Sequence, residues 1–392
     1  MVVLWYGLVP MAGALVKRYK WFLFRKRFDE LRLSPMLDYG RYARREGESC
    51  RGSSGLADSG HAEGGLAGTF RFVGGFESIT GGRTLWIRGD DLTVPVSLQN
   101  AETYLLPMQK GDGIPEVFDP SDEAPEKIRW ERVSALTEGA RVYVGGLLVY
   151  QDGRWSFAST KENPLMVIFY DGPDSSLTVR AIRAGRHRGE YWNAITPYAL
   201  VIGALCQIIM AVLFLDRPAF RLTVIAALAA LFIPLYPMIP PGLLFTVMYR
   251  RLTWRSRILR SYRDIARLPL RYLSRTWNLL PNGELYGCIT CAELPPQARD
   301  IPFLLPELTK AKRGIPAESD VWYIFGALRP GEALPVQPQD SFATFGILPG
   351  KPEIIAKRCE ITAYTMEVFA WLILFAGIGL NIFFLSMVLV LL

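Results

Sequence analysis

Apolar residues are concentrated in a few long runs along this chain of 392 residues. Residues 196–215, 221–241 and 367–392 contain at most one charged side chain each. Each run is about as long as the roughly 20 residues that a helix needs to cross a bilayer, so we predict three transmembrane helices. The shorter apolar run over residues 1–16 is either a fourth span or an interfacial anchor. Its basic residues follow the run, unlike those of a secretory signal peptide.

Basic residues cluster next to the predicted spans. Nine arginines lie between Arg250 and Arg275, against a single acidic residue, Asp264. Because loops rich in lysine and arginine stay on the cytoplasmic side, we expect both large polar segments in the cytoplasm and the C-terminus outside. The net charge of +7 follows from this topology without nucleic acid. The chain shows no organelle transit signature, so we expect an integral protein of a bacterial inner membrane.

The first polar segment, residues 69–190, alternates apolar and polar residues with the period of two that is typical of half-buried strands. Turn-forming Gly, Asp, Asn and Pro residues separate the alternating stretches. Strands are expected at residues 70–76, 84–88, 92–98, 141–150, 155–159 and 165–170. Five or six short strands around a small core predict a partly open barrel or an OB-like module.

A second, shorter β module is predicted over residues 278–362. The same alternation places its strands at residues 285–291, 321–328, 342–348 and 353–358. The second module is therefore expected to be a smaller version of the first.

The connecting segments have compositions of their own. A basic juxtamembrane helix is predicted before each module, over residues 17–46 and 242–275. Residues 47–68 have few apolar groups to bury and are expected to form a flexible loop. Four prolines between residues 234 and 241 are expected to end a span and to let a new helix start at Gly242.

Several short matches recur in the same order in the two halves of the chain. The segment DELRLSP at 29–35 parallels DIARLP at 264–269, LLP at 105–107 parallels LLP at 304–306, and GIP at 113–115 parallels GIP at 314–316. An ordered series of weak matches indicates an internal duplication. We therefore expect a membrane α + β protein, with three to four transmembrane helices and two tandem small β-barrel or OB-like cytoplasmic modules that arose by duplication.

The stretch LTEGARVYVGGLLVYQDGRWSF begins at residue 136 and is followed closely by a span. Residues 136–206 resemble the beside-a-membrane (GIDE-type) domain of mitochondrial membrane-anchored RING ubiquitin ligases. The shared elements are the EGA strand start, the GGLLVYQDG hairpin and the membrane helix that follows. The resemblance implies a β domain tied closely to a membrane. Those ligases end in a RING rich in cysteine and histidine, whereas this chain ends in an apolar span, so ligase activity is not implied.

Candidate catalytic chemistry is sparse. The chain has two histidines, His61 and His187, and five cysteines, with Cys288 and Cys291 in its one CxxC motif. A structural zinc site needs four ligands, so both cysteines are expected to be structural. Hydrolase, kinase, phosphate-loop and zinc-protease signatures do not occur. We therefore predict no catalytic, cofactor or metal site and no enzyme activity.

Two sets of residues are candidates for binding roles. Gln207 and Asn381 lie within predicted spans, where an amide tends to hydrogen-bond to another helix. Basic residues of the two juxtamembrane helices are expected to contact anionic lipid headgroups, with plain topology signals as the alternative. These residues are Lys17, Arg18, Arg25, Lys26, Arg27, Arg255, Arg257, Arg260, Arg263 and Arg267.

The leading hypothesis is a non-enzymatic membrane scaffold or complex subunit whose β modules bind a protein partner or a second copy. An alternative is a lipid-handling or transport protein. A second alternative is a membrane-tethered nucleic-acid binder, which exposed aromatic residues such as Trp86, Tyr143 and Trp155 would favour. Nucleic acid is not expected, because the basic residues cluster beside the spans and not on the modules.

Overall fold

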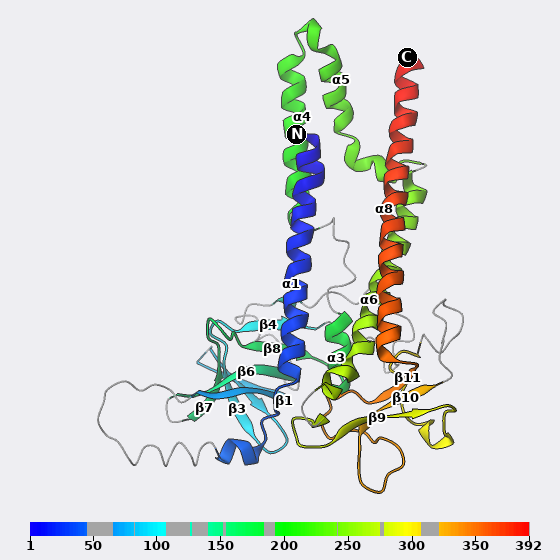
Figure 1. The fold of residues 1–392 in the computed structure, drawn as a ribbon. Coiled ribbons are helices and arrows are strands. Elements are labelled where there is room, and N and C mark those ends of the chain that lie inside the picture. Colours follow the sequence, from blue (N-terminus) through cyan, green and yellow to red (C-terminus); the bar gives the residue numbers. More distant parts are fainter. Residues whose placement is uncertain are drawn as a thin grey trace. The chain divides into compact units, whose positions relative to one another are not determined.

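The computed structural model describes residues 1–44, 66–81, 83–106, 126–127, 140–151, 154–183, 193–240, 242–274, 278–306 and 321–391. The chain divides into two compact units. The membrane unit comprises residues 1–23, 185–263 and 355–392, and the β unit comprises residues 24–184 and 264–354. Three long helices contribute residues to both units (Figure 1). They are α1 (Val9–Arg32), α6 (Gly242–Leu273) and α8 (Pro352–Leu391).

The membrane unit is helical. A short π-helix, η1 (Leu4–Leu8), leads into α1, and α4 (Thr196–Phe214) is followed by the turn η3 (Pro218–Phe220) and by α5 (Arg221–Ala230). Three stretches are long and apolar enough to cross a membrane: Thr196–Phe214, Pro218–Leu235 and Pro352–Phe384. The three predicted spans are therefore confirmed as helices of sufficient length and hydropathy. Residues 1–16 are not among these stretches within the described chain.

The proline-rich segment interrupts the helical backbone as expected. Helix α5 ends at Ala230, a 3₁₀ helix η4 covers Ile233–Met238, and α6 begins at Gly242. A proline removes a backbone donor and clashes with the preceding turn, so regular helix resumes only beyond the last proline. Small residues close the hairpin between α4 and α5, where Ala211, Val224 and Ala227 pack together.

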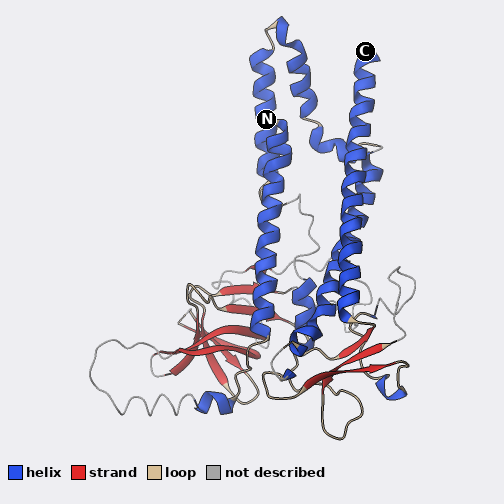
Figure 2. Ribbon diagram, viewed as in Figure 1, coloured by secondary structure: helices blue, strands red, loops and turns tan. Residues whose placement is uncertain are grey.

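The described residues of the first module form one eight-stranded sheet, whose strands are red in Figure 2. They are β1 (Leu66–Thr80), β2 (Thr84–Arg88), β3 (Thr93–Ser97), β4 (Glu102–Leu105), β5 (Glu126–Lys127), β6 (Arg141–Gln151), β7 (Arg154–Ala158) and β8 (Met166–Tyr170). All six predicted strands are present. Five of the strands form a ring in the order β1-β2-β3-β7-β6, which closes because β1 also pairs with β6.

Period-two burial explains this ring. Leu85 and Ile87 of β2 and Val94 and Val96 of β3 are fully buried, and their neighbours on β2 point to the other face. Strands β3 and β7 run parallel, and the other pairs of the ring run antiparallel. Pairing on all sides leaves the ring without a free edge.

Helix α3 (Asp174–Arg183) follows β8 and was not predicted within residues 69–190. Asp174 lies in its first turn and accepts hydrogen bonds from the Arg141 guanidinium (2.6 Å) and the Tyr170 hydroxyl (2.6 Å). A carboxylate near the N-terminus of a helix is favoured by the helix dipole. The helix buries Leu177, Ala181 and Ile182.

The second module is a three-stranded antiparallel sheet in the described residues. Its strands are β9 (Tyr286–Cys291), β10 (Trp322–Ala327) and β11 (Gly346–Pro349). The predicted strand at 353–358 is wrong, because these residues form the first turns of α8. Pro352 occupies the first helical position, where its missing N–H costs nothing, and Ile355, Ala356 and Cys359 are buried at helical spacing.

The two modules share one pairing pattern. In the first, β6 lies between β1 and β8, and in the second, β10 lies between β9 and β11. All four pairings are antiparallel. The central strand carries VYVG in one case and WYIFG in the other, and the third strand is followed by a helix in both.

Several predicted features lie outside the described residues. The loop predicted at 47–68 is described only from residue 66 onward, where β1 begins, and both histidines fall in undescribed stretches. The basic helix predicted at 17–46 corresponds to the last two-thirds of α1, which ends at Arg32, and to a short helical stretch at 39–44. The basic helix at 242–275 corresponds to α6.

Candidate functional site

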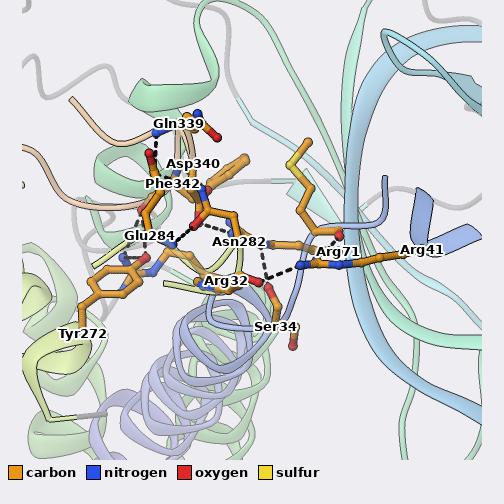
Figure 3. Close-up of polar contacts among 12 residues, drawn as sticks. Arg32, Ser34, Arg41, Arg71, Tyr272, Asn282, Glu284, Gln339, Asp340 and Phe342 are labelled. Atoms are coloured by element: carbon orange, nitrogen blue, oxygen red, sulfur yellow. Dashed lines mark hydrogen bonds and ion pairs between the residues drawn. The ribbon is translucent and has the colours of Figure 1, made fainter. Parts of the chain in front are cut away.

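Charged and aromatic side chains meet in the interior of the β unit. Among the described residues, Arg32 and Arg71 are the two largest fully buried side chains, and they meet Tyr143, Tyr272, Asp340 and Phe342 there. We call these six residues the arginine cluster; Figure 3 shows the polar contacts of five of them. The residues come from α1, both modules and α6, so the cluster joins distant parts of the sequence.

Arg32, the last residue of α1, links this helix to α6 and to the second module. One guanidinium nitrogen donates to the Tyr272 hydroxyl (3.1 Å) and to the Phe342 carbonyl (3.3 Å). The other terminal nitrogen donates to Asp29 (2.9 Å), which also pairs with Arg271 (2.7 Å). The Tyr272 hydroxyl itself donates to the Phe342 carbonyl (3.1 Å). The ends of α1 and α6 within the β unit are thus joined through two side chains and one carbonyl.

Arg71, on β1, links the first module to the second. Its Nε donates to the Ser34 carbonyl (2.8 Å), and Nη2 donates to the Asp340 carboxylate. Asp340 in turn accepts from the Phe342 amide (3.1 Å), and the Arg71 guanidinium lies over the Phe342 ring, 5.1 Å from its centre. Both members of the ion pair are buried, with side-chain exposures of 1% and 3%. A buried pair of this kind is expensive to break because the remaining charge is left without compensation.

Aromatic rings fill the space around these charges. Tyr143 of β6 packs between Phe28 of α1 and Phe342, each ring centre 5.4 Å away. Tyr272 packs on Tyr286 of β9 (5.1 Å). Offset and tilted aromatic pairs at these distances add to the energy of burial. The first module, the second module and α1 therefore share one core in the β unit.

The cluster keeps fixed protonation states near neutral pH. Burial raises the pKa of Tyr143, although Arg71 and Arg32 act against this, and burial likewise raises the pKa of Tyr272. Burial would lower the pKa of Arg32, but Tyr272 and Asp29 outweigh it, and the net pKa is raised. The phenols therefore stay neutral and the guanidinium stays charged. This arrangement suits permanent structure or anion binding better than proton transfer.

The basic residues assigned to lipid contacts in the membrane unit fall into two groups. Arg18 contacts Glu367 of α8 (3.4 Å), Arg260 pairs with the same carboxylate, and Arg263 pairs with Glu360 (3.1 Å). Arg255 is exposed and has no ion pair in the described chain. Lys17 and Arg257 are half-buried. The two glutamates of α8 were not predicted from the sequence. The signal was available, because Glu367 is the first residue of the last predicted span and Glu360 shortly precedes it.

The predicted lipid contacts in the β unit lie on α1 and α6. Lys26 is 3.9 Å from Glu30 on the same helix, and Arg27 is 3.5 Å from Glu102 of β4. Burial lowers the pKa of Arg27, which Glu102 only partly offsets. Arg25 is half-buried and Arg267 is exposed. Lys26 and Arg27 thus contact carboxylates of the chain itself.

The two intramembrane amides are both buried. Gln207 on α4 is 5% exposed and Asn381 on α8 is 7% exposed. The Asn381 amide donates to the Ile239 carbonyl (3.3 Å) in the proline-rich segment. A glycine lies one helical turn before each amide, and each glycine is in close contact with an aromatic side chain of another helix: Gly203 with Tyr6, and Gly377 with Phe245.

The CxxC cysteines lie on β9 and are free thiols. Burial raises the pKa of Cys288 to about 11, so this thiol is protonated and unreactive at neutral pH. Among the described residues, no group of three or more His, Cys, Asp or Glu side chains could hold a metal ion.

The aromatic residues that would favour nucleic-acid binding are largely inaccessible. Tyr143 is fully buried in the arginine cluster and Trp155 is 4% exposed in the barrel core. Trp86 remains partly exposed, and the Arg154 guanidinium covers its ring at 5.3 Å from the centre. Tyr143 and Trp155 therefore do not supply the exposed aromatic surface that would favour nucleic-acid binding.

No protein-family model matches this sequence, and no curated protein matches it either. The fold by itself defines a class: a protein with three helices suited to crossing a membrane and a separate unit that is rich in β-sheet.

Proposed function

We propose that this protein is a non-enzymatic integral membrane scaffold or complex subunit, in which the two β modules act together as one protein-binding platform. The observation that carries the proposal is the buried ion pair between Arg71 of the first module and Asp340 of the second. Modules that bind partners independently need no shared charged core. A shared core holds the outer surfaces of both modules in a fixed arrangement, as a composite docking surface requires.

The same proposal includes an OB-like first module and an internal duplication. The ring β1-β2-β3-β7-β6 is a five-stranded barrel with mixed pairing, which supports the OB-like assignment. The pairing β1-β6-β8 corresponds to β9-β10-β11, and the glycine–aromatic contacts of Gly203 and Gly377 recur in the two halves. The resemblance of residues 136–206 to GIDE-type domains remains a prediction consistent with a β domain beside a membrane.

We place both modules on the cytoplasmic side of a bacterial inner membrane, with the C-terminus outside. The support is the arginine-rich composition of the segments beside the spans. Anionic headgroups are the lipid partner in this scheme. Arg250, Arg251 and Arg255 are exposed on α6 and lack carboxylate partners in the described chain, which makes them the most available contacts.

A lipid-handling or transport function is the second candidate. It is favoured by Glu367, a carboxylate near the start of the last apolar stretch that is held between Arg18 and Arg260. Charged residues near or within a membrane often mark a substrate or ion pathway. The nucleic-acid alternative loses its support because Tyr143 and Trp155 are buried.

The test is a pull-down of the tagged full-length protein in mild detergent, with mass spectrometry of co-purifying proteins and lipids. We expect a stoichiometric protein partner that is lost or weakened in Asp340→Asn, which loosens the two modules, and retained in the exposed control Asp91→Asn. Circular dichroism and size-exclusion profiles check that both variants stay folded. A protein that purifies alone with a defined lipid would instead support the lipid-handling function.

A further inference from the structure

Three hydrogen-bond donors in the arginine cluster have no partner among the described residues. They are Arg32 Nε, Arg71 Nη1 and the Tyr143 hydroxyl. The three residues are 0%, 1% and 0% exposed, so bulk water does not satisfy these groups. Buried donors are almost always paired in folded proteins, so three unpaired donors in one cluster call for an acceptor.

All three donors belong to side chains that pack on Phe342. The Arg71 guanidinium lies over its ring (5.1 Å), the Tyr143 ring packs against it (5.4 Å), and Arg32 donates to its carbonyl (3.3 Å). The positive charges of Arg71 and Arg32 both act to lower the pKa of the Tyr143 hydroxyl. The three donors therefore belong to side chains that meet at one residue, Phe342.

The charges of this region do not balance. Three guanidinium groups, those of Arg32, Arg71 and Arg271, face two carboxylates, those of Asp29 and Asp340. Asp29 is shared between two of the arginines, and Asp340 is already occupied by Arg71 and by the Phe342 amide. One positive charge is left over, and Arg271 is the only member of the trio with substantial exposure, at 54% of its side chain.

A single water molecule cannot satisfy the cluster, because water accepts two hydrogen bonds and adds no charge. A monatomic anion accepts three or more hydrogen bonds and neutralises the surplus. The burial of Arg32 and Arg71 excludes a lipid headgroup or a large oxyanion. We infer that the arginine cluster binds one small anion of chloride size, held by Arg32 Nε, Arg71 Nη1 and the Tyr143 hydroxyl.

The experiment measures chloride binding to the full-length protein in detergent. The protein is purified in sodium gluconate, and bound radioactive chloride is counted by equilibrium dialysis at constant ionic strength. Thermal unfolding is followed in parallel in gluconate and in chloride. The key variant is Tyr143→Phe, which removes one donor and keeps the ring. The matched control is Thr178→Val, which removes another buried and unpartnered hydroxyl, on α3, from a residue that is not a member of the cluster.

We expect about one chloride per chain and a higher unfolding temperature in chloride than in gluconate. Tyr143→Phe should bind chloride roughly tenfold more weakly, as expected for a lost hydrogen bond to a charged group, while Thr178→Val binds like the wild type. In gluconate, Tyr143→Phe should be as stable as the wild type or more stable, because it removes an unsatisfied donor.

A second measurement does not depend on any variant. Crystals soaked in bromide should show an anomalous peak within hydrogen-bond distance of Arg71 Nη1. Absence of bound halide, or equal halide binding by the wild type and Tyr143→Phe, would overturn the inference and leave a dry cluster or an adventitious ion only. A bromide peak elsewhere on the protein, with none beside Arg71, leads to the same conclusion.

Discussion

The Arg71 guanidinium and the Asp340 carboxylate form a buried ion pair between residues 269 positions apart in the sequence. Arg71 lies on the first strand of the first module, and Asp340 precedes the last strand of the second. The contact unites two stretches that the alternating sequence pattern presents as separate modules. It also makes both stretches part of a single compact unit.

Substitution of Asp340 tests how much this ion pair contributes to the free energy of unfolding. Asp340→Ala leaves Arg71 charged and buried, so we expect a loss of about 3–5 kcal/mol in the free energy of unfolding. Denaturant unfolding in detergent, followed by tryptophan fluorescence, measures the loss. The exposed control Asp91→Ala should change the same free energy by less than about 0.5 kcal/mol. Equal effects of the two substitutions would show that the Arg71–Asp340 contact is not formed.

Two glycines of α8 provide a matched test of helix packing in the membrane unit. A Cβ atom at Gly377 would lie 2.6 Å from the Phe245 Cβ atom, whereas a Cβ atom at Gly379 meets open space. Overpacking forces side chains from their preferred rotamers, typically at a cost of about 1–3 kcal/mol. We therefore expect Gly377→Ala to lower the unfolding temperature in detergent and Gly379→Ala to leave it unchanged or slightly raised.

The proposed duplication extends this test. Gly203 occupies the corresponding place on α4, where an added Cβ atom would lie 2.5 Å from the Tyr6 ring and 2.9 Å from the Trp5 Cβ atom. Gly203→Ala should therefore destabilise the protein as Gly377→Ala does. A neutral Gly203→Ala beside a harmful Gly377→Ala would argue against equivalent roles for the two helices.

Glu284 gives a pH dependence of known sign. Burial raises its pKa, but hydrogen bonds from the Asn282 amide, the Gln339 backbone and Arg329 outweigh this, and the pKa falls below its ordinary value of 4.5. A carboxyl with a lowered folded-state pKa adds stability above its unfolded pKa and loses it as the pH falls through the folded pKa. The wild type should thus lose stability below about pH 4.5 by a component that Glu284→Gln lacks.

The measurement for Glu284 is the unfolding temperature between pH 3 and pH 7. At pH 7, Glu284→Gln should be less stable than the wild type, and the gap should shrink toward pH 3. Glu332→Gln, at an exposed position of the same module, serves as the control and should follow the wild-type curve. A gap that stays constant across this range would contradict the role assigned to Glu284.

The amount of anionic lipid that each variant retains distinguishes exposed arginines from arginines that pair with a carboxylate. The double variant Arg251→Gln, Arg255→Gln removes two exposed charges, each worth about 1 kcal/mol beside an anionic surface. We expect it to retain much less anionic lipid in native mass spectrometry, with a smaller effect of Arg263→Gln, whose charge is already paired with Glu360. Equal loss in both variants would show that the ion pairs of α8 do not limit lipid contact.

Hydropathy and the alternation of apolar and polar residues predicted the helices and strands that are recognisable within a short stretch of sequence. The three apolar spans follow from uncharged runs of sufficient length, and the strands β1, β2, β3, β6, β7 and β8 follow from alternation with a period of two. The pattern that predicts a strand at residues 353–358 is too short to separate a strand from a helix. In the folded chain these residues form the start of α8, which continues into the last span. Ile355, Ala356 and Cys359 are buried on one side of this helix.

The arginine cluster could not be predicted from local sequence patterns. Arg32 and Arg71 carry no local sign that they are buried, since arginine is usually exposed. Arg32 meets Tyr272 across 240 positions and Phe342 across 310, and such pairings exist only once the chain has folded. Likewise, the arginines of α6 look available to lipid in sequence, and only the structure shows that Glu360 and Glu367 hold two of them.

The sequence alone thus determined three stretches that can cross a membrane and most strands of the first module, because hydropathy and periodicity act on neighbouring residues. The tertiary structure decided which charges are paired and buried, how the first ring of strands closes, and that both modules share one core. Those outcomes depend on side chains brought together from distant segments, where the cost of burying a charge is offset only by a partner that local sequence does not specify.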